Sequence, residues 1–361
     1  MKAWQDAASL ILAARHGTSR AVPPAVHNYK LLCLKRHQKS NFMPGLYVFP
    51  GGTVDPADAN LKWQEHFAAF GLDNNKLTSL ISKVASRPQI FQSRENELPK
   101  EVSLRITAIR ETFEECGILI CRHKDSNTPS NWAEYVSVPR DELLMWQSKV
   151  HDNATEFFNL CQKFECYPDL WALHEWRNWM TPTTAYEKRF NTAFYLACLS
   201  HMPYAKYEAI EMEDLKWDTP ENFSSMGQIT FPPPQQYEIA KLIKLKNIDD
   251  LLDIAVKHNK EGAQLYLPVR IHLKDGFMHV MPGDTLYPKE VSLSEKQVID
   301  KSDITIEEFT KMSPVKNRTH FLDAKIRVIF TDVSGEDMHV EFPMPGYSKI
   351  AYGKEEPKNK L

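Results

Sequence analysis

The segment from Leu104 to Ile118 constrains the fold most, because its apolar residues repeat with the period of an α-helix. With about 100° of rotation per residue, one apolar stripe runs along this predicted helix. The stripe consists of Ile106, Ile109, Phe113 and Cys116. Three carboxylates cluster on the opposite side, namely Glu111, Glu114 and Glu115. One face of the helix therefore packs on a core, and the other face carries the candidate chemistry.

Glu111 stands three and four residues before the other two glutamates, so the three carboxylates share one turn and repel one another. A bound cation would relieve that repulsion, and oxygen ligands of this kind suit Mg²⁺ or Mn²⁺. The alternative is an acidic face that is simply solvated. Gly117 permits a left-handed cap at the end of the helix, after which residues 118–120 are expected to leave as a strand.

Composition limits the class of partner. The 361 residues can bury a large core, and their net charge at pH 7 is −3. Such a balanced charge provides no basic field for nucleic acid, so no nucleic-acid partner is expected. No apolar run reaches the roughly 18 residues that span a bilayer, and the run over 9–14 is too short for a signal peptide. We therefore expect a soluble, intracellular protein with no membrane span.

The six cysteines do not follow a common metal-binding pattern. Two pairs, Cys116 with Cys121 and Cys161 with Cys166, share a C-x4-C spacing that is wider than the C-x2-C of zinc ribbons. Cys116 also belongs to the packing stripe of the predicted helix. Several cysteines lie in apolar stretches, so buried free thiols are favoured over a zinc site.

Strands are predicted before the helix, over 7–14 and 29–35, and we expect these two to pair within a sheet. A third strand over 46–49 is stopped by a proline. Gly51 and Gly52 follow it and allow close approach of the backbone. They are candidates for holding a phosphate, although the tripeptide Pro-Gly-Gly more often marks a turn.

Two segments are predicted to be insertions. Residues 59–103 are polar and mixed, with a helical pattern over Trp63–Phe70. Residues 124–180 are rich in amphipathic patterns that predict helices. These helices are Asp141–Val150, Thr155–Phe164 and Leu170–Trp179. The last pattern carries three tryptophans, which either pack in a core or a lid, or stack on an adenine or a pantetheine arm.

The second half of the chain adds a strand over 194–199, and Arg189 at its entrance is a candidate phosphate ligand. Three prolines precede a predicted helix over 235–246, and another helix follows over 249–258. The C-terminal third shows alternating patterns and no catalytic constellation. Strands are predicted there over 265–273, 276–281, 325–330 and 339–342.

The glutamate-rich helix resembles the second half of the Nudix box, R-E-U-x-E-E-x-G-U, where U is aliphatic. The matching segment runs from Arg110 to Ile118, and Thr112 departs at one aliphatic position. The first half, G-x5-E, is matched by Gly52 to Asp58, with aspartate in place of glutamate. The motif would place its arginine at position 66, so an insertion of about forty-four residues separates the halves. A loop of that length is tolerable, because closure entropy grows only logarithmically.

The sequence before the box is similar to the signature of coenzyme A diphosphatases, roughly L-L-T-x-R-S-x3-R-x3-G-x3-F-P-G-G. Arg36, Gly45 and the segment Phe49–Gly52 match this signature. The residues that depart from it are Leu34, His37 and Asn41. Together with Arg-Phe-Asn-Thr from Arg189 and Pro-Pro-Gln-x-Tyr-Glu over 233–238, the pattern resembles the vertebrate peroxisomal coenzyme A diphosphatase branch of the Nudix family over nearly the whole chain.

The resemblance implies an α+β fold, a Nudix-type α/β/α sandwich with a mixed sheet. It further implies a long insertion within the box, a helical insertion and a C-terminal extension. We place the Nudix domain at 1–258, with insertions at about 59–103 and 124–180. A β-rich extension and a tail occupy 259–361.

The resemblance also implies roles for the candidate residues. The ligands of Mg²⁺ or Mn²⁺, and the catalytic residues with them, would be Glu111, Glu114 and Glu115. Arg110 would brace the box by pairing with a carboxylate. Glu211 is the candidate for a separate base or further ligand, with Glu208 and Glu213 as rivals. The candidates for substrate binding are Arg36, Gly51, Gly52 and Arg189.

The implied activity is divalent-metal-dependent hydrolysis of the diphosphate of coenzyme A or acyl-CoA, giving 3′,5′-ADP and 4′-phosphopantetheine or its acylated form. The alternatives are an ADP-ribose or NADH diphosphatase, and a non-catalytic nucleotide-binding Nudix domain. Asn359-Lys360-Leu361 is a variant of the S-K-L peroxisomal address and predicts recognition by a peroxisomal import receptor. We therefore expect a peroxisomal protein, with the cytoplasm or mitochondria as alternative locations.

Overall fold

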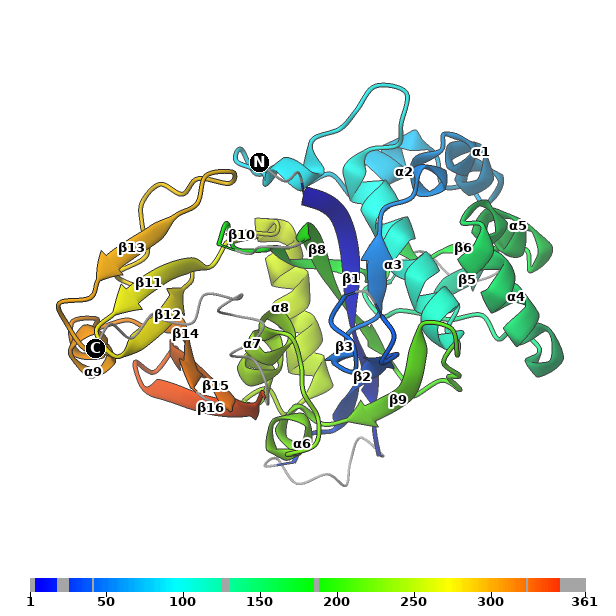
Figure 1. Ribbon diagram of the computed structural model, residues 1–361. Helices are drawn as coiled ribbons and strands as arrows, with labels where there is room; N and C mark the ends of the chain where they lie inside the picture. Colours follow the sequence, from blue (N-terminus) through cyan, green and yellow to red (C-terminus); the bar gives the residue numbers. More distant parts are fainter. Residues whose placement is uncertain are drawn as a thin grey trace.

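A mixed eight-stranded sheet forms the centre of the computed structural model, which describes residues 4–17, 26–40, 42–124, 130–184, 188–322 and 324–344 (Figure 1). The strand order is β10-β7-β8-β1-β2-β3, with β4 paired to β1 and β9 paired to β2. The strands are β1 (Trp4–Arg15), β2 (Tyr29–Arg36), β3 (Tyr47–Val48), β4 (Gly51–Thr53), β7 (His174–Met180), β8 (Arg189–Leu199), β9 (Met212–Asp218) and β10 (Leu265–Tyr266). Strand β1 runs parallel to β8 and antiparallel to β2 and β4.

Strand β1 organises the core from the middle of this sheet. The predicted pairing of the first two strands is confirmed, because Ala13 lies opposite Leu31. Residues 7–14 of strand β1 are all buried, since the strand has neighbours on both edges and layers on both faces. Alternation along the strand then supplies two cores: Leu10 and Leu12 face one, and Ile11 faces the other together with Ala13.

Helices cover both faces of the sheet, which confirms the predicted sandwich. Helix α3 (Lys100–Cys116) packs on one face, where Ile106 and Ile109 join the core of Leu10 and Leu12. Helices α7 (Pro233–Leu242) and α8 (Ile248–Glu261) cover the other face and lie between this sheet and a C-terminal sheet (Figure 1).

Helix α3 ends as the sequence predicts but is buried on every side. Gly117 adopts a φ of 73°, and its amide donates to the Phe113 carbonyl at 2.7 Å. All residues from Lys100 to Cys116 are buried, so the alternative of a solvated acidic face is wrong. The predicted strand after the helix is also wrong in its bounds. It begins only at β5 (Cys121–His123), because Leu119 forms no more than an isolated bridge.

The two ends of the predicted insertion at 59–103 lie close together, because the Leu98 amide donates to the Ala59 carbonyl at 2.9 Å. The helix predicted near Trp63 is confirmed. The elements of this region are η1 (Pro56–Ala59), α1 (Lys62–Ala69), α2 (Asn74–Thr78) and η2 (Gln89–Phe91). Trp63 packs on Phe157 of the second insertion with ring centroids 5.8 Å apart, so the two insertions share one core.

Two of the three helices predicted in the second insertion are confirmed, and the third is wrong. The elements present are α4 (Arg140–Asp152), α5 (Thr155–Lys163), β6 (Cys166–Pro168) and η3 (Leu170–Ala172). Most of the segment 170–179 instead belongs to strand β7. A bulge at Trp176 places its indole in the same core as Trp179. Two residues three positions apart then face the same side, which is the spacing that the sequence pattern attributes to a helix. Both indole N–H groups donate to Glu238, at 2.7 and 2.6 Å, and both rings are buried, so Trp176 and Trp179 pack in the core. The third tryptophan, Trp171, is partly buried against the core on the other face of the sheet.

The C-terminal strands form a second sheet in the order β13-β11-β12-β14-β15-β16. They are β11 (Val269–Leu273), β12 (Gly276–Val280), β13 (Val298–Lys301), β14 (Asn317–Leu322), β15 (Lys325–Thr331) and β16 (Asp337–Pro343), and the remaining helices are α6 (Pro220–Ser225) and α9 (Ile306–Lys311). All four predicted strand regions are found. Strand β14 escaped prediction because its buried residues include Asn317, Arg318 and Thr319, with Arg318 paired to Asp284 at 2.8 Å. Within the described ranges, no helix is long and apolar enough to cross a membrane.

Candidate active site

A buried ion pair joins the two halves of the interrupted motif. The Asp58 carboxylate accepts hydrogen bonds from Arg110 Nε at 2.8 Å and Nη2 at 3.0 Å, and from the Thr107 hydroxyl at 2.8 Å. Asp58 and Arg110 are 1% and 3% exposed, so water screens this pair poorly. Residues on either side of the long insertion therefore form one structural unit.

Arg110 also holds the acidic side of helix α3 together. Its guanidinium lies 2.9 Å from Glu111 Oε1 and 3.2 Å from Glu114 Oε2, and Nη2 donates to the Thr53 carbonyl at 3.2 Å. Burial opposes its charge, but the carboxylates keep the pKa of Arg110 well above its usual value. This is the geometry expected of a residue that braces the box.

The two glycines of β4 lie directly against the carboxylates. The Gly51 amide donates to Glu115 Oε2 at 3.0 Å, so this donor serves a carboxylate in the structure. A side chain at Gly52 would overlap the Glu111 carboxylate, and Gly51 has a φ of 149°. Gly52 is thus required for the close approach of β4 to α3, and Gly51 for the close approach of β4 to Ala8 and Ser9 of β1. A phosphate contact by either glycine stays a prediction.

Burial makes the acidic cluster unfavourable without a cation. Glu111, Glu114 and Glu115 are 8%, 8% and 2% exposed, and burial is the main cause that raises the pKa of each. The pKa of Glu111 rises to about 8 despite the nearby charge of Arg110. Glu115 Oε1 is buried and has no hydrogen-bond partner in the described part of the chain. An orphaned carboxylate oxygen beside two further carboxylates is a donor set that suits a hard divalent cation.

Helix α4 of the second insertion adds two contacts that sequence reasoning missed. His151 Nδ1 lies 2.9 Å from Glu114 Oε1, and the Gln147 side chain donates to the Glu114 carbonyl at 3.1 Å. Burial disfavours the imidazolium, but the Glu114 carboxylate outweighs it and raises the pKa of His151. These residues stand 37 and 33 positions from Glu114, and no local pattern in the sequence marks them.

The charge of Glu211 contributes to the raised pKa of all three glutamates, which indicates that its carboxylate lies near the cluster. Its rivals are engaged elsewhere. Glu208 accepts hydrogen bonds from the amides of Ile210 and Glu211 at 2.8 and 3.2 Å, and Glu213 pairs with Lys35 at 2.6 Å. Among the residues that the structure describes, none forms a hydrogen bond or ion pair with the Glu211 carboxylate. Glu211 is therefore a free carboxylate beside the cluster.

Arg36 stands at the end of β2 and acts on the same cluster. Its positive charge partly offsets the rise in the pKa of Glu115 that burial causes. Its Nε donates to the Phe42 carbonyl at 3.0 Å, and Nη2 donates to Ser40 Oγ at 3.1 Å. The guanidinium is therefore fixed in place near the carboxylates.

Arg189 is placed differently, at the start of β8. It is 5% exposed and donates to the carbonyls of Thr181 at 3.1 Å and Leu293 at 2.9 Å. No contact with the carboxylate cluster is found for it across the described ranges. Its predicted role as a phosphate ligand stays a prediction, and the structure gives it a role in joining backbone segments.

A mixed sheet between helical layers, with a carboxylate-rich helix packed on a glycine strand, defines a Nudix domain. In agreement, the family model described as the NUDT19 Nudix domain matches residues 4–242. The model described as the NUDT19 C-terminal domain matches residues 270–330.

Three known proteins are similar to this chain. Acyl-coenzyme A diphosphatase NUDT19 of Xenopus laevis is 35% identical over 350 residues, which cover 90% of this chain and 92% of that protein. The Homo sapiens protein of the same name is 34% identical over 310 residues, covering 81% of this chain and 82% of its own. The crystal structure of a Nudix hydrolase from Alicyclobacillus acidocaldarius aligns with 70% of this chain and 97% of its own, at 19% identity and a TM-score of 0.49. The chain belongs to the NUDT19 family of Nudix hydrolases, which confirms the family predicted from the split box.

Proposed function

We propose that this protein hydrolyses the diphosphate of coenzyme A and acyl-CoA with Mg²⁺ or Mn²⁺, releasing 3′,5′-ADP and 4′-phosphopantetheine or its acylated form. The proposal rests on the contact between the two halves of the box. Glu111 pairs with Arg110, Glu115 accepts a hydrogen bond from the Gly51 amide, and the other oxygen of Glu115 is buried without a partner among the described residues. The relatives named acyl-coenzyme A diphosphatase NUDT19 support the choice of substrate.

The acidic cluster would hold the divalent ion. Its ligands would be Glu111, Glu114 and Glu115. The ion would neutralise charge on the diphosphate and lower the pKa of a water molecule. Arg110 restrains two of these carboxylates, and His151 orients one of them by its contact with Glu114. These contacts limit the freedom of the ligands before any substrate binds.

Two further residues would act on the substrate. Glu211 has no hydrogen-bond or ion-pair partner among the described residues and lies near the cluster, which supports a role as the base. It would accept the proton of the attacking water as the water oxygen bonds to one phosphorus and the bridging P–O bond of the diphosphate breaks. Arg36 is held by Phe42 and Ser40, and its guanidinium is suited to bind a phosphate oxygen. The signature departures at Leu34 and His37 leave the recognition of the coenzyme A moiety to other contacts, while Asn41 lies outside the described residues.

The test is incubation of purified protein with Mg²⁺ and, separately, coenzyme A, ADP-ribose and NADH, with products identified by chromatography. We expect 3′,5′-ADP from coenzyme A, with a higher kcat/KM than for ADP-ribose or NADH. Preference for ADP-ribose or NADH would refute the substrate. Absence of turnover with all three would refute the enzyme and favour a nucleotide-binding domain.

We also propose a peroxisomal location, with the cytoplasm or mitochondria as alternatives. The proposal rests on the sequence Asn359-Lys360-Leu361, which lies outside the described residues. Removal of Leu361 from an N-terminally tagged protein should change punctate staining into diffuse staining. Puncta that persist without Leu361 would contradict recognition of this tripeptide by an import receptor.

A further inference from the structure

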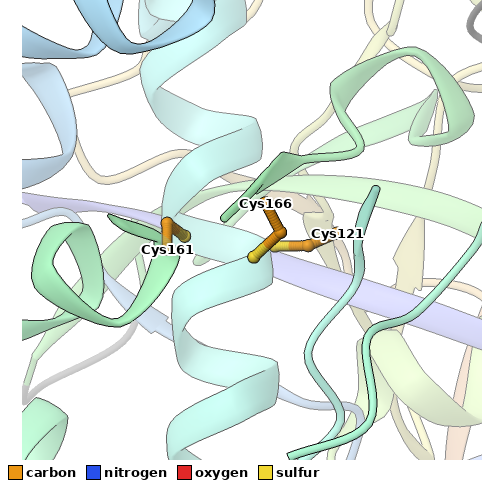
Figure 2. A group of neighbouring side chains, drawn as sticks. All are labelled: Cys121, Cys161 and Cys166. Atoms are coloured by element: carbon orange, nitrogen blue, oxygen red, sulfur yellow. The ribbon is translucent and has the colours of Figure 1, made fainter. Parts of the chain in front are cut away.

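Three of the six cysteines converge where strand β5 meets the second insertion (Figure 2). Cys121 lies on β5, Cys161 on α5 and Cys166 on β6, and their sulfur atoms all lie within 4.8 Å of one another. All three thiols are free and at most 1% exposed. The prediction that these cysteines are buried is confirmed, and none of them forms a disulfide. Cys121 belongs to one C-x4-C pair of the sequence and the other two cysteines to the second pair, so the spacing did not predict this group.

The fourth member of those pairs is not part of the group. Cys116 lies on α3, where its sulfur donates to the Thr112 carbonyl at 2.9 Å. Antiparallel pairing of β5 and β6, in which His123 lies opposite Cys166, brings Cys121 close to Cys166. The turn between α5 and β6 is short, so Cys161 near the end of α5 lies beside these two cysteines. The cluster is thus a product of tertiary structure and not of a local motif.

The spacing of the three sulfurs is close to that of a metal–thiolate site. A zinc–sulfur bond of about 2.3 Å places thiolates roughly 4 Å apart around one ion. The observed limit of 4.8 Å exceeds this by less than about 1 Å, which small side-chain rotations can supply. Sulfur ligands select soft cations such as Zn²⁺ and Cu⁺ over Mg²⁺ and Mn²⁺, which prefer oxygen.

The surroundings shield the three sulfurs from water. Cys121 is 1% exposed, and Cys161 and Cys166 are 0% exposed. Two imidazoles lie at the edge of the cluster, with His66 Nε2 at 2.8 Å from the Cys166 carbonyl and His123 Nδ1 at 3.4 Å from the Glu165 carbonyl. Three converging sulfurs form the donor set that a soft cation needs, and the cation would bind them as thiolates.

We propose that Cys121, Cys161 and Cys166 form a closed structural site for one thiophilic cation, Zn²⁺ or Cu⁺, separate from the carboxylate site. Cu⁺ is satisfied by three thiolates, whereas Zn²⁺ takes a fourth ligand. The nearby imidazoles are His66, whose Nε2 lies 2.8 Å from the Cys166 carbonyl, and His123, which lies opposite Cys166 in the strand pair. The ion would tie β5, β6 and α5 together. It would thereby stabilise the insertion whose helix α4 supplies the contact to Glu114.

The experiment uses the full-length protein purified anaerobically under reducing conditions. After treatment with a chelator, the protein is titrated with Zn²⁺ or Cu⁺ against a competing chromophoric chelator, with saturating Mg²⁺ present to fill the carboxylate site. Cd²⁺ is a spectroscopic probe, because thiolate ligation produces an ultraviolet sulfur-to-metal charge-transfer band. Cys161→Ser removes one ligand. Cys198→Ser is the matched control, since Cys198 is an equally buried free thiol in the other core.

We expect one equivalent of Zn²⁺ or Cu⁺ per chain, the charge-transfer band with Cd²⁺, and a higher thermal midpoint in the loaded protein. Cys161→Ser should weaken binding at least tenfold and lose the band, whereas Cys198→Ser should keep both. Absence of binding by the wild type would overturn the proposal whatever the variants do. Equal binding by Cys161→Ser, or a disulfide among the three cysteines in a thiol count, would also overturn it.

Discussion

The ion pair between Asp58 and Arg110 tests whether a specific electrostatic contact holds the two halves of the box across the insertion. Asp58→Ala removes the acceptor of two hydrogen bonds from Arg110, one from the Thr107 hydroxyl and one from the Asp55 amide. Breaking a buried pair and leaving one charge behind costs about 3–5 kcal/mol. Arg110 keeps Glu111 at 2.9 Å and Glu114 at 3.2 Å, so we expect the lower end, a loss of about 3 kcal/mol in the free energy of unfolding.

The assay is urea unfolding followed by tryptophan fluorescence, in which the midpoint should fall while the slope stays constant. Asp58→Asn keeps one acceptor oxygen and should lose less than Asp58→Ala. The matched control is Glu307→Ala, which removes an exposed ion pair with Lys311 and should leave the midpoint unchanged. A loss below about 0.5 kcal/mol for Asp58→Ala would refute the reasoning, because packing alone would then hold the halves together.

Three further predictions concern the carboxylates and one buried histidine. Glu115→Gln should raise the thermal midpoint of the metal-free protein, because it removes a buried carboxylate with a raised pKa, and it should abolish the rise caused by Mg²⁺. An undiminished response to Mg²⁺ in differential scanning fluorimetry would contradict the ligand assignment. His151→Ala should lower kcat about tenfold with little change in KM, since Glu114 loses an orienting contact. Steady-state kinetics equal to wild type would exclude that role. Burial lowers the pKa of His174 to about 4. The unfolded state therefore binds its proton more readily, and stability present above pH 6.5 should fall as the pH drops toward 4. Thermal midpoints measured across this range should depend less on pH in His174→Gln, and an identical dependence would contradict the assignment.

Local sequence patterns were sufficient to identify the family and to predict much of the fold. The apolar period of helix α3 and the glycine at its end predicted the helix and its left-handed cap, because both signals lie within a few turns of chain. The strands over 7–14 and 29–35 followed from continuous apolar runs. Motif spacing identified Gly52–Asp58 as the missing half of the box, and the contact of Asp58 with Arg110 agrees with that assignment.

Contacts between distant residues decided the rest. The bulge at Trp176 produced a helix-like spacing in what is a strand, so periodicity alone misassigned it. His151 contacts Glu114 from a helix in an insertion, and Cys121 lies near two cysteines that are forty or more positions away. A short window of sequence contains neither contact. Burial of the acidic side of α3 arises from the surrounding elements as a whole. The residue order specified which carboxylates share a turn, and only packing from the sheet and both insertions excluded the water that would otherwise have solvated them.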